Sequence, residues 1–207
     1  ATCVQEEREK HRGEVLPLCS PLLQLIHGLP GSGKKQVLIW IRTYFEDVWN
    51  WTYGEEFCYL APLNSMASNI GGSTVHSWGQ VGFKDRRGVH IAPKMRQDEE
   101  TPTMTVKCGK LRFLFIDEIE ACGVKLIGNV EEATSRNAGH LFRKAAHAEL
   151  PRVFGGLNVF LLGDFWQLPP TGQIAIMSNP YCRTVLESAQ GNSIMSMFWL
   201  GGHREAL

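Results

Sequence analysis

Continuous apolar runs recur at four places along the chain, and each is only a few residues long. They are bounded by glycine, proline or acidic residues, and they read PLLQLIHG (21–28), EFCYLAP (56–62), LRFLFIDE (111–118) and LNVFLLGD (157–164). Short apolar runs with such boundaries predict strands that are buried inside a sheet.

The segments between these runs have helical periodicity instead. In KKQVLIWIRTYFEDVWNW (34–51), apolar residues recur at helical spacing, at Val37, Ile41, Tyr44, Phe45 and Val48. This spacing predicts a helix with one buried face. LNSMASNIGG (63–72) predicts a short helix that ends at its glycines. Strands that alternate with helices indicate an α/β fold with a parallel sheet.

Two polar segments interrupt this pattern. The mixed-charge N-terminus predicts an arm over residues 1–21, followed by one domain over 22–207. Within that domain, residues 83–110 form a polar insertion, and the stretch 84–112 carries eight Lys or Arg and four Asp or Glu. A solvated surface segment is the ordinary interpretation of such a charge run. A basic rim beside a nucleic-acid path is the alternative.

Composition places the chain among globular proteins. It has 207 residues, 43% of them hydrophobic and 20% charged, and its formal net charge is zero. Binding to nucleic acid or to an anionic membrane would therefore need a local charged patch. No apolar run approaches the roughly 20 residues of a membrane span. Because the first residue is Ala1 and not Met, we expect a processed chain or a fragment.

The cysteines indicate a compartment. The chain has six, and no two of them have C-x-x-C spacing, which argues against a zinc site. Most lie in or beside apolar runs, as reduced buried cysteines do. We therefore expect a reducing, intracellular compartment.

The stretch HGLPGSGKK (27–35) joins the first predicted strand to the first predicted helix. In this context glycines let backbone N–H groups face a phosphate, and the helix N-terminus adds positive potential. We therefore predict a nucleotide-binding loop made of Gly28, Gly31, Ser32, Gly33, Lys34 and Lys35. Lys34 would reach the terminal phosphates. A strand-to-helix turn with incidental glycines is the alternative.

Two later strands deliver polar side chains to the same edge of the predicted sheet. Asp117 and Glu118 follow LRFLFI, where Asp117 can hold Mg²⁺ through water and Glu118 can polarise an attacking water. Gln167 follows the last strand on a proline-stiffened turn, where its amide can read a terminal phosphate. The alternative is that these strands end in solvated acids and loops.

A glycine-flanked turn, GGSTVHSWGQ (71–80), combines hydroxyls, an imidazole and an indole. Hydroxyls and backbone N–H groups contact phosphates, and an aromatic ring can stack on a base. The candidate nucleic-acid contacts are Thr74, His76, Ser77 and Trp78. The alternative is an ordinary turn with Trp78 in the core.

Four segments in this order resemble the first motor domain of superfamily 1B DNA helicases. The likeness is to the petite-integration-frequency (PIF) type and to the helicase region of Helitron transposons. HGLPGSGK resembles the Walker A motif, APLNSMASNIGGSTVHSW motif Ia, LFIDEIE the Walker B motif and FGGLNVFLLGDFWQLPP motif III. The likeness covers Leu22 to Trp199, and it implies a RecA-like P-loop NTPase domain with a parallel sheet flanked by helices.

The resemblance also implies a role for each matched residue. Lys34 would bind the β- and γ-phosphates of ATP, and Asp117 would hold the water shell of Mg²⁺. Glu118 would be the catalytic base, and Gln167 would sense the γ-phosphate and couple it to DNA. Four residues would lie along single-stranded DNA: Thr74, His76, Ser77 and Trp78.

The sequence departs from the family pattern at two points. The Walker A Ser or Thr, a direct Mg²⁺ ligand, is Lys35 here, and an ammonium group has no lone pair with which to coordinate a cation. Either water takes this ligand position or Lys35 contacts phosphate. The second departure is that the arginine motifs of a second RecA-like domain are not matched, and Arg204 comes too early. Since an arginine finger is worth about 10³–10⁵ in rate, we expect this chain alone to be a poor hydrolase.

The sequence thus predicts the ATP-binding motor domain of a PIF-like DNA helicase, truncated or degenerate. Its expected location is the nucleus or a DNA-containing organelle, and its expected partner is single-stranded DNA, bound weakly. The alternative is a helicase-derived, non-catalytic structural or interaction subunit of a larger assembly, which Lys35, the zero net charge and the unmatched second domain favour. An unrelated P-loop kinase or ATPase does not account for GDFWQLPP (163–170).

Overall fold

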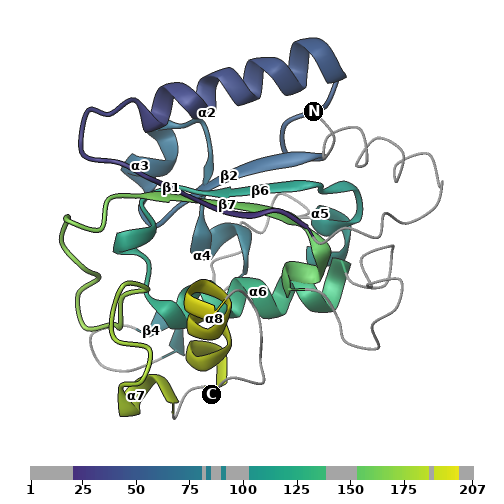
Figure 1. Cartoon of the computed structure of the whole chain (residues 1–207). Helices are drawn as coiled ribbons and strands as arrows, with labels where there is room; N and C mark the ends of the chain where they lie inside the picture. Colours follow the sequence, from purple (N-terminus) through teal and green to yellow (C-terminus); the bar gives the residue numbers. More distant parts are fainter. Residues whose placement is uncertain are drawn as a thin grey trace.

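A five-stranded, all-parallel sheet forms the centre of the structure (Figure 1). The computed structural model describes residues 21–80, 83–84, 90–91, 103–138, 153–186 and 189–200. The strand order is β1-β7-β6-β2-β3. The strands are β1 (Leu23–His27), β2 (Phe57–Ala61), β3 (Ser73–Thr74), β6 (Phe113–Ile116) and β7 (Asn158–Gly163). All four apolar runs form strands, so the predicted α/β fold with a parallel sheet is confirmed.

Helices cover both faces of this sheet. They are α2 (Lys34–Thr43), α3 (Asn64–Asn69), α4 (Val75–Trp78), α5 (Met104–Lys110), α6 (Val124–Ala138), α7 (Arg183–Leu186) and α8 (Ala189–Leu200). Figure 1 shows α2 on one face and α4, α6 and α8 on the other. Three helical turns are not α-helical. The π-helical η1 (Tyr44–Val48) is wider than an α-helix, and the 3₁₀ turns η2 (Ile119–Ala121) and η3 (Val153–Gly156) are tighter. Strands β4 (Phe83–Lys84) and β5 (His90–Ile91) pair antiparallel in a separate two-stranded sheet.

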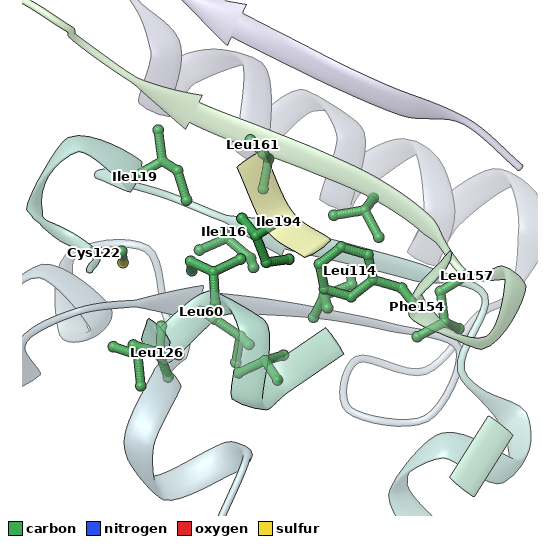
Figure 2. Close-up of a cluster of buried hydrophobic side chains, with 14 of the residues drawn as sticks. Leu60, Leu114, Ile116, Ile119, Cys122, Leu126, Phe154, Leu157, Leu161 and Ile194 are labelled. Atoms are coloured by element: carbon green, nitrogen blue, oxygen red, sulfur yellow. The ribbon is translucent and has the colours of Figure 1, made fainter. Parts of the chain in front are cut away.

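The two faces of the sheet carry two different cores. Because side chains alternate along a strand, Phe113 and Phe115 of β6 face α2, and Leu114 and Ile116 face the opposite layer. The core under α2 is mainly aromatic, whereas the other core is mainly aliphatic (Figure 2). Figure 2 shows Ile194 of α8 packed against the aliphatic side of the sheet. The sheet is therefore covered on both faces, as parallel sheets usually are.

The helix after the loop departs from the predicted register. Phe45 is buried at 4% exposure, but Tyr44 and Val48 are 42% and 61% exposed, so the prediction that these two lie on the buried face is wrong. The cause is η1, because a π-helical turn contains more residues than an α-helical turn and rotates the positions after Thr43. Phe45 thereby reaches the aromatic core, with ring centroids 4.9 Å from Trp51 and 5.0 Å from Phe113.

Strand β1 also differs from its prediction. It pairs with β7 on one side and, within the described part of the chain, with no strand on the other. Leu23 and Leu25 are 37% and 39% exposed as a result. The apolar run correctly indicated a strand, but an edge position leaves it only partly covered.

The polar segments lie mostly outside the described residues. Residues 1–20 of the predicted arm, most of the insertion at 83–110 and Arg204 are among those left out. The end of the insertion forms α5, whose Met104 and Cys108 are buried in the aliphatic core. Among the described cysteines, Cys58, Cys108 and Cys122 are buried. Over the same residues, the helices are all too short or too polar to cross a membrane.

The π-helical register predicts a difference between two neighbouring aromatic residues. Phe45→Ala should lower the free energy of unfolding by about 3–5 kcal/mol, because it removes a ring from the centre of the aromatic core. Tyr44→Ala, the matched control, should change it by less than about 1 kcal/mol because its ring is largely in solvent. Urea unfolding followed by circular dichroism measures both, and equal losses would contradict the described register.

Candidate nucleotide site

The loop between β1 and α2 has the backbone geometry of a phosphate cradle. Gly31 and Gly33 have positive φ values of 76° and 90°, a region that favours glycine because it has no β-carbon. A β-carbon on Gly28 would lie 2.5 Å from the Ser32 Oγ atom. The Gly28 N–H donates to the Gly163 carbonyl at 3.2 Å, which ties the start of the loop to the end of β7.

A cavity of about 680 Å³ lies beside this loop and gathers the predicted nucleotide-site residues. Its walls include Gly31, Ser32, Gly33, Lys34, Lys35, Asp117, Glu118 and Gln167. Gly28 is not in the wall and acts through the loop's shape. Besides Pro30 of the loop itself, the sequence did not indicate five further wall residues: Gln36, Ile39, Met66, Asn69 and Ile70. They come from α2 and from α3 and its C-terminal end, which the fold alone places opposite each other.

The two lysines of the loop differ in their present contacts. The Lys34 ammonium donates to the carbonyls of Gly28 and Leu29, so it is folded back on its own loop and must rotate to reach a phosphate. Lys35 is exposed in the cavity wall. Both cations line a space that an anion would fill, which makes the cavity suited to phosphate groups.

Asp117 ends β6 at the edge where the loop lies. Its backbone N–H donates to the Leu60 carbonyl at 2.8 Å, and the residue is 8% exposed. Burial raises the pKa of the Asp117 carboxyl above its ordinary value, although a hydrogen bond from the Glu118 backbone and the charge of Lys34 act in the opposite direction. A cation bound in the cavity would therefore meet the Asp117 carboxyl, which already interacts with the charge of Lys34.

Glu118 has an uncommon backbone conformation. Its φ is 52° and its ψ is 48°, which places a non-glycine residue in the left-handed region at a cost of about 1–3 kcal/mol. This conformation ends the path of β6 and starts η2. Glu118 remains half-buried in the cavity wall as the chain turns back under the sheet edge.

Glu120 is a polar residue that the sequence interpretation did not identify as part of the site. It is 1% exposed, and its Oε2 atom accepts a hydrogen bond from the Asp164 N–H at 3.1 Å. Burial, followed by a hydrogen bond with the Glu118 side chain, raises the pKa of Glu120 to about 7. In the sequence it reads as a third acid in IDEIE (116–120), a pattern that solvated turns share.

The turn after β7 carries Gln167 and is organised by Asp164. The Asp164 side chain is buried and accepts from the Trp166 N–H at 3.0 Å, and the Gln167 N–H donates to the Asp164 carbonyl at 3.0 Å. His27 approaches the same carboxylate, with 3.8 Å between Nε2 and Oδ1. Gln167 is thus held at the mouth of the cavity by its own turn.

The predicted nucleic-acid residues lie apart from this cavity, on β3 and α4. The Thr74 hydroxyl accepts from the Ser77 N–H at 3.2 Å and caps α4, and Ser77 is exposed. His76 is half-buried, and burial lowers the pKa of its imidazole.

Trp78 does not have the exposure that stacking on a base requires. It is 8% exposed and belongs to the aliphatic core, and the Lys107 ammonium lies 6.0 Å from its ring centroid. The structure therefore agrees with the alternative interpretation, in which Trp78 is a core residue. Its hydrophobic ring is stabilised inside the molecule, so stacking would require the ring to leave the core.

The cavity fits a nucleotide better than it fits a tightly held cation. Backbone curvature and two lysines suit phosphates, but Asp117 and Glu118 are the acids in its wall. Over the described residues, no group of three or more His, Cys, Asp or Glu side chains is placed to hold a metal ion. Mg²⁺ would therefore depend on phosphate oxygens and water for most of its ligands.

The parallel sheet and the loop after β1 define the class: this is a RecA-like P-loop domain. No protein-family model matches the chain. The ATP-dependent DNA helicase RRM3 of Saccharomyces cerevisiae is 26% identical over 147 residues, which is 70% of this chain and 18% of RRM3. The ATP-dependent DNA helicase PIF1 of Candida albicans is 29% identical over 143 residues, which is 69% of this chain and 14% of PIF1.

A solved structure agrees in fold. The crystal structure of Bacteroides Pif1 bound to single-stranded DNA matches with a TM-score of 0.52 and 22% identity, covering 83% of this chain and 34% of that one. The chain therefore matches a PIF-type helicase domain, as its motifs predicted, and it spans less than a fifth of the two curated relatives.

The buried Glu120 carboxyl predicts a dependence of stability on pH. Because its pKa is raised from 4.5 to about 7, the folded chain binds this proton more tightly than the unfolded chain does. Its contribution to stability is therefore full below pH about 4.5 and is lost as pH rises to about 7. Relative to Glu120→Gln, the wild type should lose up to about 3 kcal/mol between pH 5 and pH 8.

Urea unfolding at pH 5, 6.5 and 8 measures this difference. Glu131→Gln is the matched control, because Glu131 is also buried but lies on α6 and accepts from the Phe154 N–H. Parallel pH curves for wild type and Glu120→Gln would contradict the placement of Glu120.

Proposed function

We propose that this chain is the ATP-binding motor domain of a PIF-like DNA helicase. The observation that carries the proposal is the convergence of Lys34, Asp117, Glu118 and Gln167 on one cavity. These residues come from three separate segments, so the shared cavity is a property of the fold and not of one motif. The names of the curated relatives, ATP-dependent DNA helicases, support ATP as the nucleotide. A compartment that contains DNA follows from this proposal.

Each residue of the cavity has a task in this proposal. The loop and the N-terminus of α2 hold the phosphates, and Lys34 leaves its carbonyl partners to bind the terminal ones. Glu118 orients and deprotonates the attacking water, and Gln167 contacts the γ-phosphate and registers its loss. Asp117 would hold Mg²⁺ through its water shell, and the cation would neutralise charge on the phosphates.

Lys35 favours the binding of phosphate over the binding of Mg²⁺ in this cavity. Its ammonium group has donors and no acceptor, so it can contact a phosphate oxygen but cannot coordinate Mg²⁺. Its charge also repels a cation in the same cavity. We therefore propose a nucleotide site with a weakened requirement for Mg²⁺.

The second candidate is a helicase-derived domain that binds nucleotide or a partner without hydrolysis. Lys35 is the observation that favours it, because loss of a direct metal ligand lowers hydrolysis more than binding. The intact set of Lys34, Asp117, Glu118 and Gln167 in one cavity favours the motor domain instead.

Substituting Lys35 tests the nucleotide site. The wild type should bind the slowly hydrolysed analogue ATPγS with little enhancement by Mg²⁺. Lys35→Thr should raise affinity about tenfold in the presence of Mg²⁺, or about 1.4 kcal/mol, because it adds a hydroxyl ligand and removes a repelling charge. Isothermal calorimetry with and without Mg²⁺ measures both.

Two controls accompany this titration. Lys34→Ala should abolish binding, and Lys125→Thr, at an exposed lysine outside the cavity, should change nothing. Absence of wild-type binding at millimolar ATPγS would refute the proposed site. Weaker binding by Lys35→Thr would show instead that Lys35 is itself a phosphate contact in a rebuilt site.

A second cavity, of about 280 Å³, supports the DNA part of the proposal. It is lined by Pro62, Leu63, His76, Ala121, Gly123, Leu126, Pro169, Pro170, Thr171 and Gln173. It therefore combines the predicted nucleic-acid segment with the proline turn that follows Gln167. With Trp78 in the core, His76 is the aromatic residue in this lining that we propose contacts a base.

Binding of single-stranded DNA should be weak and should fall as salt rises, because phosphate contacts release counterions. The lowered pKa of His76 leaves its imidazole neutral at pH 7. His76→Ala should therefore weaken binding roughly fivefold, in line with loss of about 1 kcal/mol of base contact, without changing the salt slope. Fluorescence anisotropy with a labelled oligothymidine measures both quantities.

Tyr44→Ala is the control for that measurement, since Tyr44 is an exposed aromatic residue on the α2 side. Binding that is insensitive to salt, or absent at low salt, would move the proposal to the second candidate. A changed salt slope in His76→Ala would show that His76 binds as a cation.

A further inference from the structure

Two short segments contribute to both the nucleotide cavity and the second cavity. In the first segment, Glu118 lines the nucleotide cavity, and Ala121 and Gly123 line the second one. In the other segment, Gln167 lines the nucleotide cavity, and the second cavity is lined by Pro169, Pro170, Thr171 and Gln173. A displacement of either segment would therefore change the lining of both cavities.

Glu120 joins these two segments. It lies between Glu118 and Ala121 on η2, and its Oε2 atom accepts from the Asp164 N–H at 3.1 Å. Asp164 organises the Gln167 turn through its carbonyl and carboxylate. One buried carboxyl thus links the proposed catalytic base to the proposed phosphate sensor.

Gly163 makes room for this link. A β-carbon at position 163 would lie 2.2 Å from the Glu120 Oε2 atom, a distance at which one of the two groups must move. Alanine at this position would therefore push the carboxyl away from the Asp164 N–H.

The second oxygen of the Glu120 carboxyl, Oε1, is buried. Among the described residues, no donor reaches Oε1, and its oxygen is inaccessible to solvent. The Glu118 side chain is the neighbour whose hydrogen bond, after burial, raises the pKa of the Glu120 carboxyl. A buried oxygen without a donor is costly, which gives Glu120 a preferred arrangement with Glu118.

We propose that Glu120 is a positioning residue that couples the nucleotide cavity to the second cavity. It holds the Glu118 carboxyl and the Asp164–Gln167 turn in one relative arrangement, so that occupancy of one cavity changes affinity in the other. The coupling between ATP and single-stranded DNA rests on the proposed function. The link between η2 and the Asp164–Gln167 turn is independent of the proposed function, because it is the hydrogen bond from the Asp164 N–H to Glu120.

The first measurement needs no ligand. Amide hydrogen exchange, followed by mass spectrometry, reports opening of residues 164–173 in the 207-residue chain. Glu120→Leu should raise exchange there at least tenfold, because the Asp164 N–H loses its acceptor. Glu120→Gln should keep the wild-type rate, since its carbonyl still accepts and its amide donates to Glu118. Gly163→Ala should resemble Glu120→Leu by an independent route.

The second measurement is the coupling between ligands. The affinity for ATPγS is measured with and without saturating oligothymidine, and the ratio of the two values is the coupling factor. The wild type and Glu120→Gln should give a factor of at least about five, the lower end for coupled sites. Glu120→Leu should bring the factor to within twofold of one.

Glu131→Leu is the matched control for both measurements. It also removes a buried carboxyl that accepts a backbone N–H, at 3.2 Å from Phe154, but Glu131 lines neither cavity. It should keep the exchange rate of 164–173 and the coupling factor, even where its stability falls.

The outcomes separate the two levels of the proposal. Unchanged exchange in both Glu120→Leu and Gly163→Ala overturns the positioning role. Raised exchange with full coupling in Glu120→Leu overturns the coupling, as does a wild-type factor near one. Failure of the wild type to bind ATPγS refutes the proposed function, and the exchange measurement then still decides whether Glu120 holds the turn.

Discussion

The position of β7 between β1 and β6 is the constraint on which the site depends. Because all three strands are parallel, their carboxyl ends meet at one edge of the sheet, where ligands of open α/β folds bind. The phosphate loop leaves β1, the acidic pair leaves β6, and the Gln167 turn leaves β7. Figure 1 shows these connections on the same side of the sheet. The Gly28–Gly163 hydrogen bond closes this edge around the loop.

Burying acids at that edge is energetically unfavourable, and the local structure there shows it. Asp117 and Glu120 are buried, and burial raises the pKa of each carboxyl. Glu118 has a left-handed backbone. Strain and raised pKa values of this kind gather at functional sites, because only the surrounding fold can maintain them. The same burial that disfavours the charged form of each acid also makes the acids sensitive to each other's charge.

In the proposed function, Lys35 alters the chemistry of the cavity. The loop keeps its glycine geometry and remains beside Asp117 and Glu118. A cation in place of a neutral ligand changes which partner balances the phosphate charge. The proposal thus separates the phosphate cradle, which depends on backbone conformation, from the Mg²⁺ site, which would depend on side chains.

The sequence by itself determined four strands of the parallel sheet, the main helix, the parallel α/β class and eight of the residues that meet in the nucleotide cavity. Periodicity and motif order are properties of the amino-acid sequence, so they can be recognised without the three-dimensional structure. The tertiary structure alone decided the edge position of β1, the exposure of Tyr44 and the burial of Trp78, since each depends on what packs against the element. It also decided the role of Glu120. An acid after a strand looks solvated in sequence, and only the approach of Gly163 and the Asp164 N–H, 44 positions away in the case of Asp164, places it inside the molecule.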